Sequence, residues 1–241
     1  MISSRFSCAL VALLVLVPLS SRAKGKDASP KAKYAAALKK LRAGPQGELE
    51  PVFQQGLVAA EQLEKAIVNA NETGKQLPAA ATKLEGFVVG THEALFAVPK
   101  VSFFLKLARK KGTAVDVAFF ENLQRTYPEY DAWPVYFRQQ TDYSGCEVFD
   151  EPELIPVYRG WLEFAEKHPK AYAAQVEKQL TRLDEMMTQR SCACGKKPEV
   201  IAGFEEFLKA FPKAPITPKV KARLADIQAD KAEMTFECRS G

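Results

Sequence analysis

Four cysteines in the second half of the chain are the residues whose type and spacing most plainly permit chemistry: Cys146, Cys192, Cys194 and Cys238. The fifth cysteine, Cys8, lies in an N-terminal segment that we interpret below as a cleaved export signal, and an even number of cysteines in an exported protein favours disulfide bonds. Two alternatives are a metal site built on Cys192-x-Cys194 with His168 or the other cysteines, and a redox-active Cys-x-Cys pair. Structural zinc sites favour two or more residues between paired cysteines. We therefore predict two disulfides and no metal.

Expected helix lengths bring these four cysteines to one edge of the molecule. Cys146 precedes a helix predicted from about residue 153 to residue 168, and its return helix carries Cys192 and Cys194 back. A second helical pair returns with Cys238. Cysteines one residue apart do not easily bridge each other, so each should take a distant partner. Sequence order favours Cys146–Cys192 with Cys194–Cys238, and the swapped pairing remains the alternative.

Histidines and nucleophile motifs give little support for catalysis. His92-Glu93 begins like a zinc-protease helix, but Phe96 occupies the place of the second histidine. His168 falls at a repeat position that is aromatic elsewhere, which favours packing. The sequence has no Gly-x-Ser-x-Gly elbow and no Gly-Lys-Ser/Thr phosphate loop. We expect no cofactor, and whether the protein is an enzyme stays uncertain, leaning towards no.

Residues 127–151 form a segment rich in aromatic and charged side chains, which we name the aromatic connector. Tyrosine and tryptophan give large rigid contacts with a polar handle, which favours a binding surface. The residues predicted to bind a partner are Tyr130, Trp133, Tyr136 and Arg138. The same pattern fits a long connector held on the helices by its aromatic residues. A hydrolase that uses surface carboxylates such as Asp150, in a groove lined by Tyr130, Trp133 and Tyr136, is a further alternative.

The N-terminus reads as a secretory signal peptide over residues 1–23. Arg5 is followed by an apolar run from about Cys8 to Leu19, and small residues, Ser21 and Ala23, occupy the −3 and −1 positions. The run is shorter than the roughly 20 apolar residues that span a bilayer, and no later segment is long and apolar enough to do so. We expect a soluble mature chain that begins near Lys24 and acts in the periplasm or outside the cell.

Positive charge is concentrated in residues 24–47, a basic leader that continues into the first helix. This segment carries seven basic residues against one acid, Asp27, a net charge of +6. The whole chain has a formal charge of +5 and the predicted signal peptide holds Arg5 and Arg22, so residues 48–241 sum to −3. The basic character belongs to the leader, and we expect no nucleic-acid partner.

Apolar periodicity predicts helices throughout the chain. Ser29-Pro30 signals a helix start and Gly44-Pro45 its end. Further helices are expected within residues 48–126, one of them from Pro78 with an apolar stripe at Leu84, Phe87, Val88, Leu95 and Phe96. No convincing run of alternating apolar and polar residues and no Asn-Gly hairpin turn is present. The expected fold is all-α.

A motif of two aromatic or apolar residues, three apart, followed by a proline occurs three times. Its copies are Phe120-x-x-Leu123-x-x-x-Tyr127-Pro128, Trp161-x-x-Phe164-x-x-x-His168-Pro169 and Phe204-x-x-Phe207-x-x-x-Phe211-Pro212. Residues three apart lie on one helix face, and the proline stops the helix one turn later. A period near 40 residues with two helices each predicts stacked helical hairpins, two of them within residues 152–241.

The segment Phe-Glu-Glu-Phe-Leu-Lys-Ala-Phe-Pro at 204–212 resembles the second helix of tetratricopeptide-like repeats of bacterial envelope proteins. Trp161 and Phe204 fall where that family has an aromatic residue. The resemblance covers the C-terminal half only. Val157 and Val200 replace the family's small residue, and the Leu-Gly-x-x-Tyr signature of its first helix is missing. The resemblance implies an α-solenoid-like protein that holds partners.

These observations together predict an exported, soluble helical protein, stapled by disulfides at one edge. We expect it to bind or scaffold a protein or another macromolecule of the cell envelope. The alternatives are an envelope hydrolase that uses carboxylates near the aromatic connector, and a structural or inhibitory disulfide-stapled module. A deep pocket near Trp133 with two facing carboxylates would favour the hydrolase, whereas a shallow extended groove would favour binding.

Overall fold

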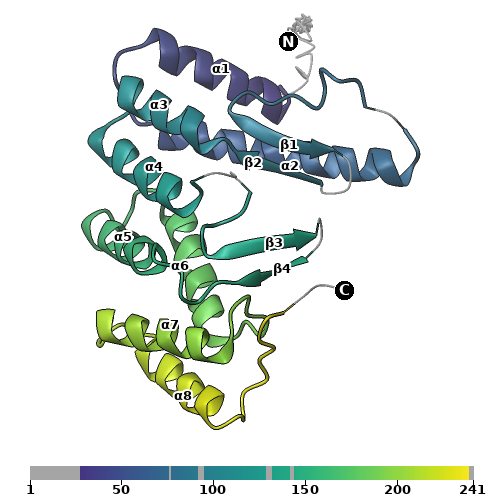
Figure 1. Cartoon of the computed structure of the whole chain (residues 1–241). Helices are drawn as coiled ribbons and strands as arrows, with labels where there is room; N and C mark the ends of the chain where they lie inside the picture. The colour runs from purple at the N-terminus through teal and green to yellow at the C-terminus, as the bar shows by residue number, and fades with distance from the viewer. Residues whose placement is uncertain (1–27, 76, 92–94, 129–131, 142–143, 239–241) are drawn as a thin grey trace, which may run out of the picture.

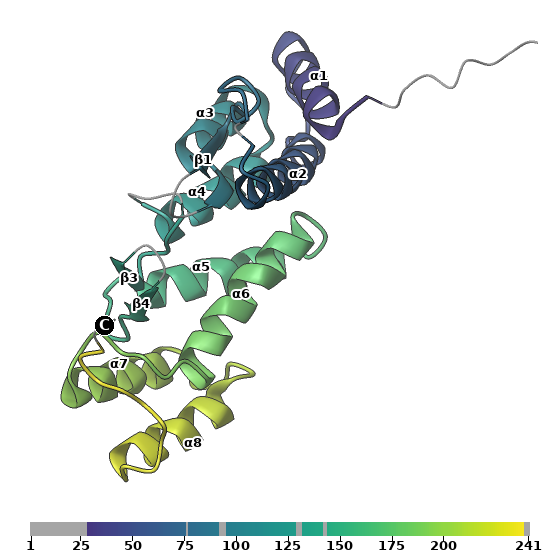
Figure 2. The same cartoon turned by 90° about the vertical axis from the view of Figure 1, so that its right-hand side faces the viewer.

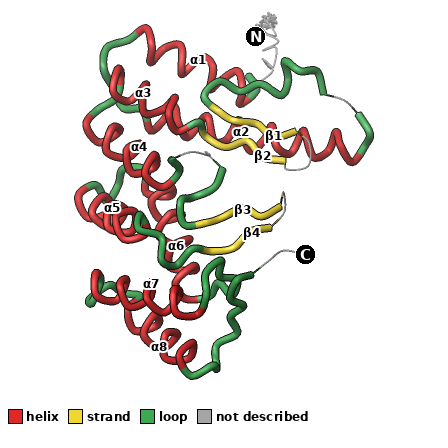
Figure 3. The backbone as a smooth tube through the Cα atoms, viewed as in Figure 1, coloured by secondary structure: helices red, strands yellow, loops and turns green. Residues whose placement is uncertain are grey.

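The computed structural model describes residues 28–75, 77–91, 95–128, 132–141 and 144–238. The predicted signal peptide, Tyr130 and His92 lie outside these residues. The described part contains eight helices and four short strands, which Figures 1 and 3 show. The helices are α1 (Pro30–Ala43), α2 (Glu50–Glu72), α3 (Val101–Lys111), α4 (Ala114–Thr126), α5 (Leu154–Lys167), α6 (Ala173–Thr188), α7 (Lys197–Ala210) and α8 (Thr217–Gln228). The strands are β1 (Phe87–Thr91), β2 (Leu95–Pro99), β3 (Phe137–Thr141) and β4 (Ser144–Glu147).

Consecutive helices pack in four pairs, α1 with α2, α3 with α4, α5 with α6 and α7 with α8. The pairs follow one another along the molecule, from α1 at one end to α8 at the other (Figures 1 and 2). The described chain is therefore mostly helical, and α5–α6 and α7–α8 lie where two helical hairpins were predicted. None of the described helices has both the length and the apolar character needed to cross a membrane.

The helix signals of the sequence act as expected at α1 and α4. Ser29 caps α1, its hydroxyl accepting a hydrogen bond from the Ala32 amide, and Pro30 occupies the first turn. Thr113 and Asp116 form a capping box at the start of α4. Local chemistry thus fixes where these helices begin.

The prediction that the fold is all-α is wrong in two places, and the first lies between α2 and α3. Phe87, Val88 and Phe96, expected on one helix, lie on the antiparallel hairpin β1–β2, which packs on α2. Each apolar run is only five residues long and rich in aromatic and β-branched residues, which favours strands. Gly86, with a φ of +77°, makes the left-handed turn into β1.

The second departure is the hairpin β3–β4, inside the aromatic connector. Phe137 pairs with Glu147, Arg138 with Cys146 and Gln139 with Gly145, and the register shifts after Gln139. The strands are short, and β3 is largely polar and exposed. Little alternation is left in such a sequence, so periodicity could not reveal the hairpin.

A buried carboxylate joins three helix pairs. Asp116 is 2% exposed and accepts hydrogen bonds from the Leu49 amide before α2, from Thr113 and from the Tyr172 hydroxyl before α6. The Tyr172 ring stacks on Phe119 with their centroids 3.7 Å apart. Burial, and then its hydrogen bond to Asp116, raises the pKa of Tyr172 far above its ordinary value. These hydrogen bonds to Asp116 tie the starts of α2, α4 and α6 together.

The repeated aromatic motif forms the core, as predicted. Trp161, Phe164, Phe204 and Phe207 are all at most 3% exposed. The Trp161 indole donates a buried hydrogen bond of 2.9 Å to the Thr126 hydroxyl, which joins α5 to α4. Such a satisfied polar contact fixes how two helices meet, in addition to the apolar surface that they bury.

Candidate binding site

The hairpin β3–β4 is extended by two segments that are remote in sequence. The Glu147 amide donates to the Cys192 carbonyl, and the Glu147 carbonyl accepts from the Cys194 amide. The chain near residue 193 bonds in turn to residues 235–238, because the Ala193 amide donates to the Thr235 carbonyl. The segments around residues 193 and 235, which follow α6 and α8, therefore line up beside the hairpin β3–β4 through isolated bridges.

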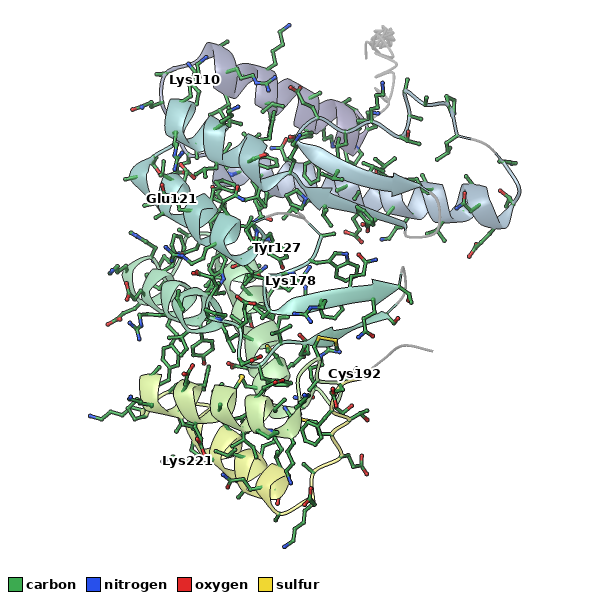
Figure 4. All side chains as sticks on the ribbon, viewed as in Figure 1. Lys110, Glu121, Tyr127, Lys178, Cys192 and Lys221 are labelled. Atoms are coloured by element: carbon green, nitrogen blue, oxygen red, sulfur yellow. A yellow bond between two sulfur atoms is a disulfide. The ribbon has the colours of Figure 1, made fainter. Side chains whose placement is uncertain are left out.

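Both predicted disulfides form at this edge, but the preferred pairing is wrong. The bridges are Cys146–Cys194, with Cα atoms 5.1 Å apart, and Cys192–Cys238, with Cα atoms 5.5 Å apart. Figure 4 shows a yellow sulfur–sulfur bond beside Cys192. The segment of Cys192 and Cys194 lies between β4 and the C-terminal residues, so each cysteine meets a different neighbour. The local register of the segments decides the pairing, and sequence spacing carries no information on it.

The aromatic connector forms an open groove, which we name the Trp133 groove, with a volume of about 470 Å³. Its lining residues are Pro128, Trp133, Pro134, Val135, Phe137, Arg138 and Gln139. Trp133 and Phe137 stack with ring centroids 5.0 Å apart. Both rings are half-buried, while Arg138 and Gln139 are exposed on β3. The groove thus combines an aromatic floor with a polar, positively charged rim.

Backbone hydrogen bonds and a glycine hold the groove in shape. The Val135 amide donates to the Thr126 carbonyl, and the Phe137 amide donates to the Pro134 carbonyl. The Phe137 ring lies against Gly145 of β4, where an added Cβ would overlap it. Glycine is therefore required opposite this ring. Cys146, the next residue, is bridged to Cys194, so the strand behind the groove is covalently fixed.

The four predicted binding residues do not all reach this surface. Trp133 and Arg138 line the Trp133 groove, and Tyr130 lies outside the described residues. Tyr136 is completely buried, so it is not available to a partner at this surface. Because Tyr136 directly precedes β3, its side chain lies opposite that of Phe137. The sequence reasoning missed Phe137 and Gly145, since it treated the connector as irregular chain.

Two polar side chains, Tyr136 directly before β3 and Glu147 at the end of β4, are buried behind the groove. The Tyr136 hydroxyl and the Glu147 Oε2 atom are buried and lack a hydrogen-bond partner among the described residues. Burial raises the pKa of the Glu147 carboxyl, and the nearby cations Arg182 and Arg190 partly offset this. Burial likewise raises the pKa of Tyr136. Buried polar atoms without partners are destabilising, which marks this region as less than optimally packed.

A second pocket is lined in part by α6, and we name it the α6 pocket. It has a volume of about 200 Å³ and lies between α6 and the first half of the chain. Its lining residues are Phe53, Leu57, Val98, Pro99, Val101, Phe119, Leu123, Tyr127, Ala132, Gln175, Lys178, Gln179 and Arg182. Tyr127 and Lys178 are labelled in Figure 4.

Metal and carboxylate chemistry find no support in the described residues. No group of three or more His, Cys, Asp or Glu side chains gathers there to hold a metal ion. The described lining of the Trp133 groove contains no carboxylate. The four cysteines proposed for an alternative metal site are taken up by disulfides.

Searches of the whole chain against protein-family models, curated proteins and solved structures each found no match.

Proposed function

We propose that the protein is an exported binding module and that a protein or another macromolecule of the cell envelope docks in the Trp133 groove. The stacked pair of Trp133 and Phe137 carries this proposal, because half-exposed aromatic rings on a rigid support are the usual centres of binding surfaces. Arg138 adds an exposed cation beside them, which favours a partner with a carboxylate at its edge.

Rigidity supports the same proposal. The groove stands on a hairpin that is fixed by Cys146–Cys194, and the Gln140 amide group donates a hydrogen bond of 2.6 Å to the Cys238 carbonyl. A preformed surface loses little conformational entropy when a partner binds. The helix pairs act in this proposal as an α-solenoid-like scaffold that presents the hairpin, in keeping with the resemblance to tetratricopeptide-like repeats.

Export is part of the proposal. The charged, apolar and small residues of positions 1–23 have the order of a signal peptide. Two disulfides suit an oxidising compartment outside the cytoplasm. N-terminal sequencing of the mature protein should show a chain that starts near Lys24, whereas an intact Met1 on the major soluble form would refute export.

Site-specific photo-crosslinking tests the groove. A photoreactive residue replaces exposed Gln139 at the groove or, as the control, exposed Lys221 on α8, and each protein is incubated with envelope extract. We expect a discrete crosslinked species from position 139 that is absent from position 221. The Trp133→Ala change should remove it, since loss of a central aromatic residue weakens binding by about 2 kcal/mol or more. Identical products at both positions would contradict the proposal.

A further inference from the structure

The α6 pocket has a chemical asymmetry that packing alone does not require. Gln175, Lys178, Gln179 and Arg182 face it from α6, and their spacing of i, i+3, i+4 and i+7 defines one face of the helix. The opposite wall, from α2, β2, α3 and α4, is almost wholly apolar. A helix face that packs on an apolar wall is normally apolar itself.

Other residues of α6 already supply its packing surface. Val176, Leu183, Met186 and Met187 are at most 5% exposed. The polar face is therefore separate from the apolar face by which α6 packs into the core. An open cavity remains in front of the polar face. Its wall includes completely buried Phe119 and nearly buried Phe53.

The two amides of the polar face are held in place. Gln179 is 7% exposed and accepts a hydrogen bond from the Tyr127 hydroxyl. Gln54 on α2 donates a hydrogen bond of 2.6 Å to Gln175. These contacts join α6 to α4 and α2 and fix the frame of the pocket.

Neither cation of the polar face has a close acidic partner among the described residues. Lys178 and Arg182 form no ion pair within 4.0 Å with a carboxylate of the described residues, and no described carboxylate lines the pocket. Glu147 lies near enough to Arg182 to interact through its charge, but it belongs to the buried group behind the groove. Arg182 is half-buried and Lys178 is exposed, so one cation lies deeper than the other.

We propose that the α6 pocket binds a small amphipathic carboxylate, whose apolar body contacts the wall of Phe53, Leu57 and Val98 and whose carboxylate pairs with Arg182 and Lys178. Apolar walls with a few converging polar groups are typical of ligand sites. Arginine pairs with carboxylates through two parallel hydrogen bonds. At about 30 Å³ for each water-sized group, a volume of about 200 Å³ holds roughly seven such groups, which matches an apolar chain of about seven carbons with its carboxylate at the two cations. Octanoate has this size and chemistry.

Isothermal titration calorimetry of octanoate against the full mature protein tests the proposal. We expect saturable binding with a Kd on the order of 1 mM or tighter. Octanol, which lacks the charge, and acetate, which lacks the apolar body, should both bind at least about tenfold more weakly. Absence of saturable octanoate binding, or equal binding of octanol, would overturn the assignment.

Single substitutions distinguish the contribution of the two charges to octanoate binding from the contribution of the cavity volume. Arg182→Gln should weaken octanoate binding about tenfold and Lys178→Gln about threefold, since Lys178 is more exposed. Lys221→Gln on α8 is the matched control and should leave the affinity unchanged (Figure 4 labels Lys178 and Lys221). Leu57→Trp should fill the pocket and abolish binding without a change of charge. Full affinity in Lys178→Gln and Leu57→Trp would overturn the proposal even if Arg182→Gln did not fold.

The inference is independent of the macromolecular partner. Trp133 lines the groove and does not line the α6 pocket. Trp133→Ala should therefore leave octanoate binding unchanged while it removes the groove crosslink. Loss of octanoate binding in Trp133→Ala would contradict a separate pocket.

Discussion

The two β-hairpins of this protein have similar length and very different support. β1–β2 is apolar and packs on α2, with Phe87 in edge-to-face contact with Tyr34 and Phe104. β3–β4 is polar along β3 and is tied to the rest of the chain by Cys146–Cys194 and by backbone hydrogen bonds. One hairpin is stabilised by burial and the other by a covalent bridge. The second can therefore leave aromatic surface open to a partner.

The largest effect that tests this comparison is expected in β1. Phe87→Ala should lower the free energy of unfolding by about 3–5 kcal/mol, because the ring is buried among aromatic neighbours. Val88→Ala is the matched control on the same strand, since Val88 is 37% exposed, and it should change stability by less than about 1 kcal/mol. Denaturant unfolding gives both values. Equal losses of unfolding free energy in Phe87→Ala and Val88→Ala would mean that burial does not stabilise β1–β2.

The second test removes the covalent support of β3–β4. Replacing Cys146 and Cys194 together by alanine should lower the free energy of unfolding by about 2–4 kcal/mol, because the unfolded chain regains freedom over a separation of 48 residues. Amide hydrogen exchange should quicken in residues 137–147 and stay slow in β1–β2. Faster exchange in both hairpins alike would break the comparison.

A smaller effect is expected where β3–β4 shapes the groove. Gly145→Ala should move the Phe137 ring away from Trp133 and lower stability by about 1–3 kcal/mol, because an added Cβ would overlap that ring. The change should alter tryptophan fluorescence. Gly47→Ala serves as the control, since nothing lies within 4 Å of an added Cβ there. Unchanged fluorescence in Gly145→Ala would show that the glycine does not position the ring.

The smallest effect concerns Glu147 at the end of β4. Burial raises its pKa, so the folded state binds this proton more tightly than the unfolded state does. Stability should therefore fall as pH rises from the ordinary carboxyl pKa of about 4.3 to the raised value, and then level off. Glu147→Gln should remove this pH-dependent loss of stability and should therefore raise the free energy of unfolding at pH 7. Unfolding midpoints of both proteins between pH 4 and pH 8 measure this pH dependence. The same pH profile in Glu147→Gln as in the original protein would argue against a buried Glu147 with a raised pKa.

Much of the helical framework could be predicted from the sequence. Ser29-Pro30 is a local start signal, and the aromatic-to-proline spacing of Trp161 to Pro169 marks a helix end wherever it occurs. Core positions such as Phe207 follow from that spacing, because three residues return a side chain to the same helix face. These signals are local, and they do not depend on contacts with distant parts of the chain.

The hairpins and the candidate site depend on contacts between distant segments. Cys146 pairs with Cys194 because the Glu147 amide donates a hydrogen bond to the Cys192 carbonyl, which sets the register of the two segments. The spacing of the cysteines in the sequence does not determine that register. Tyr136 and Phe137 could be separated into buried and half-buried residues only once β3 was known. The polar face of α6 is visible in the sequence, but its apolar wall comes from four other elements.

Disulfide mapping of the purified protein tests most directly the claim that a covalently fixed hairpin carries the Trp133 groove. Proteolysis without reduction, followed by mass spectrometry, identifies which cysteine peptides are joined. The account predicts Cys146 linked to Cys194 and Cys192 linked to Cys238. Free thiols, or the pairs Cys146–Cys192 and Cys194–Cys238, would contradict the register on which β3–β4 and the Trp133 groove depend.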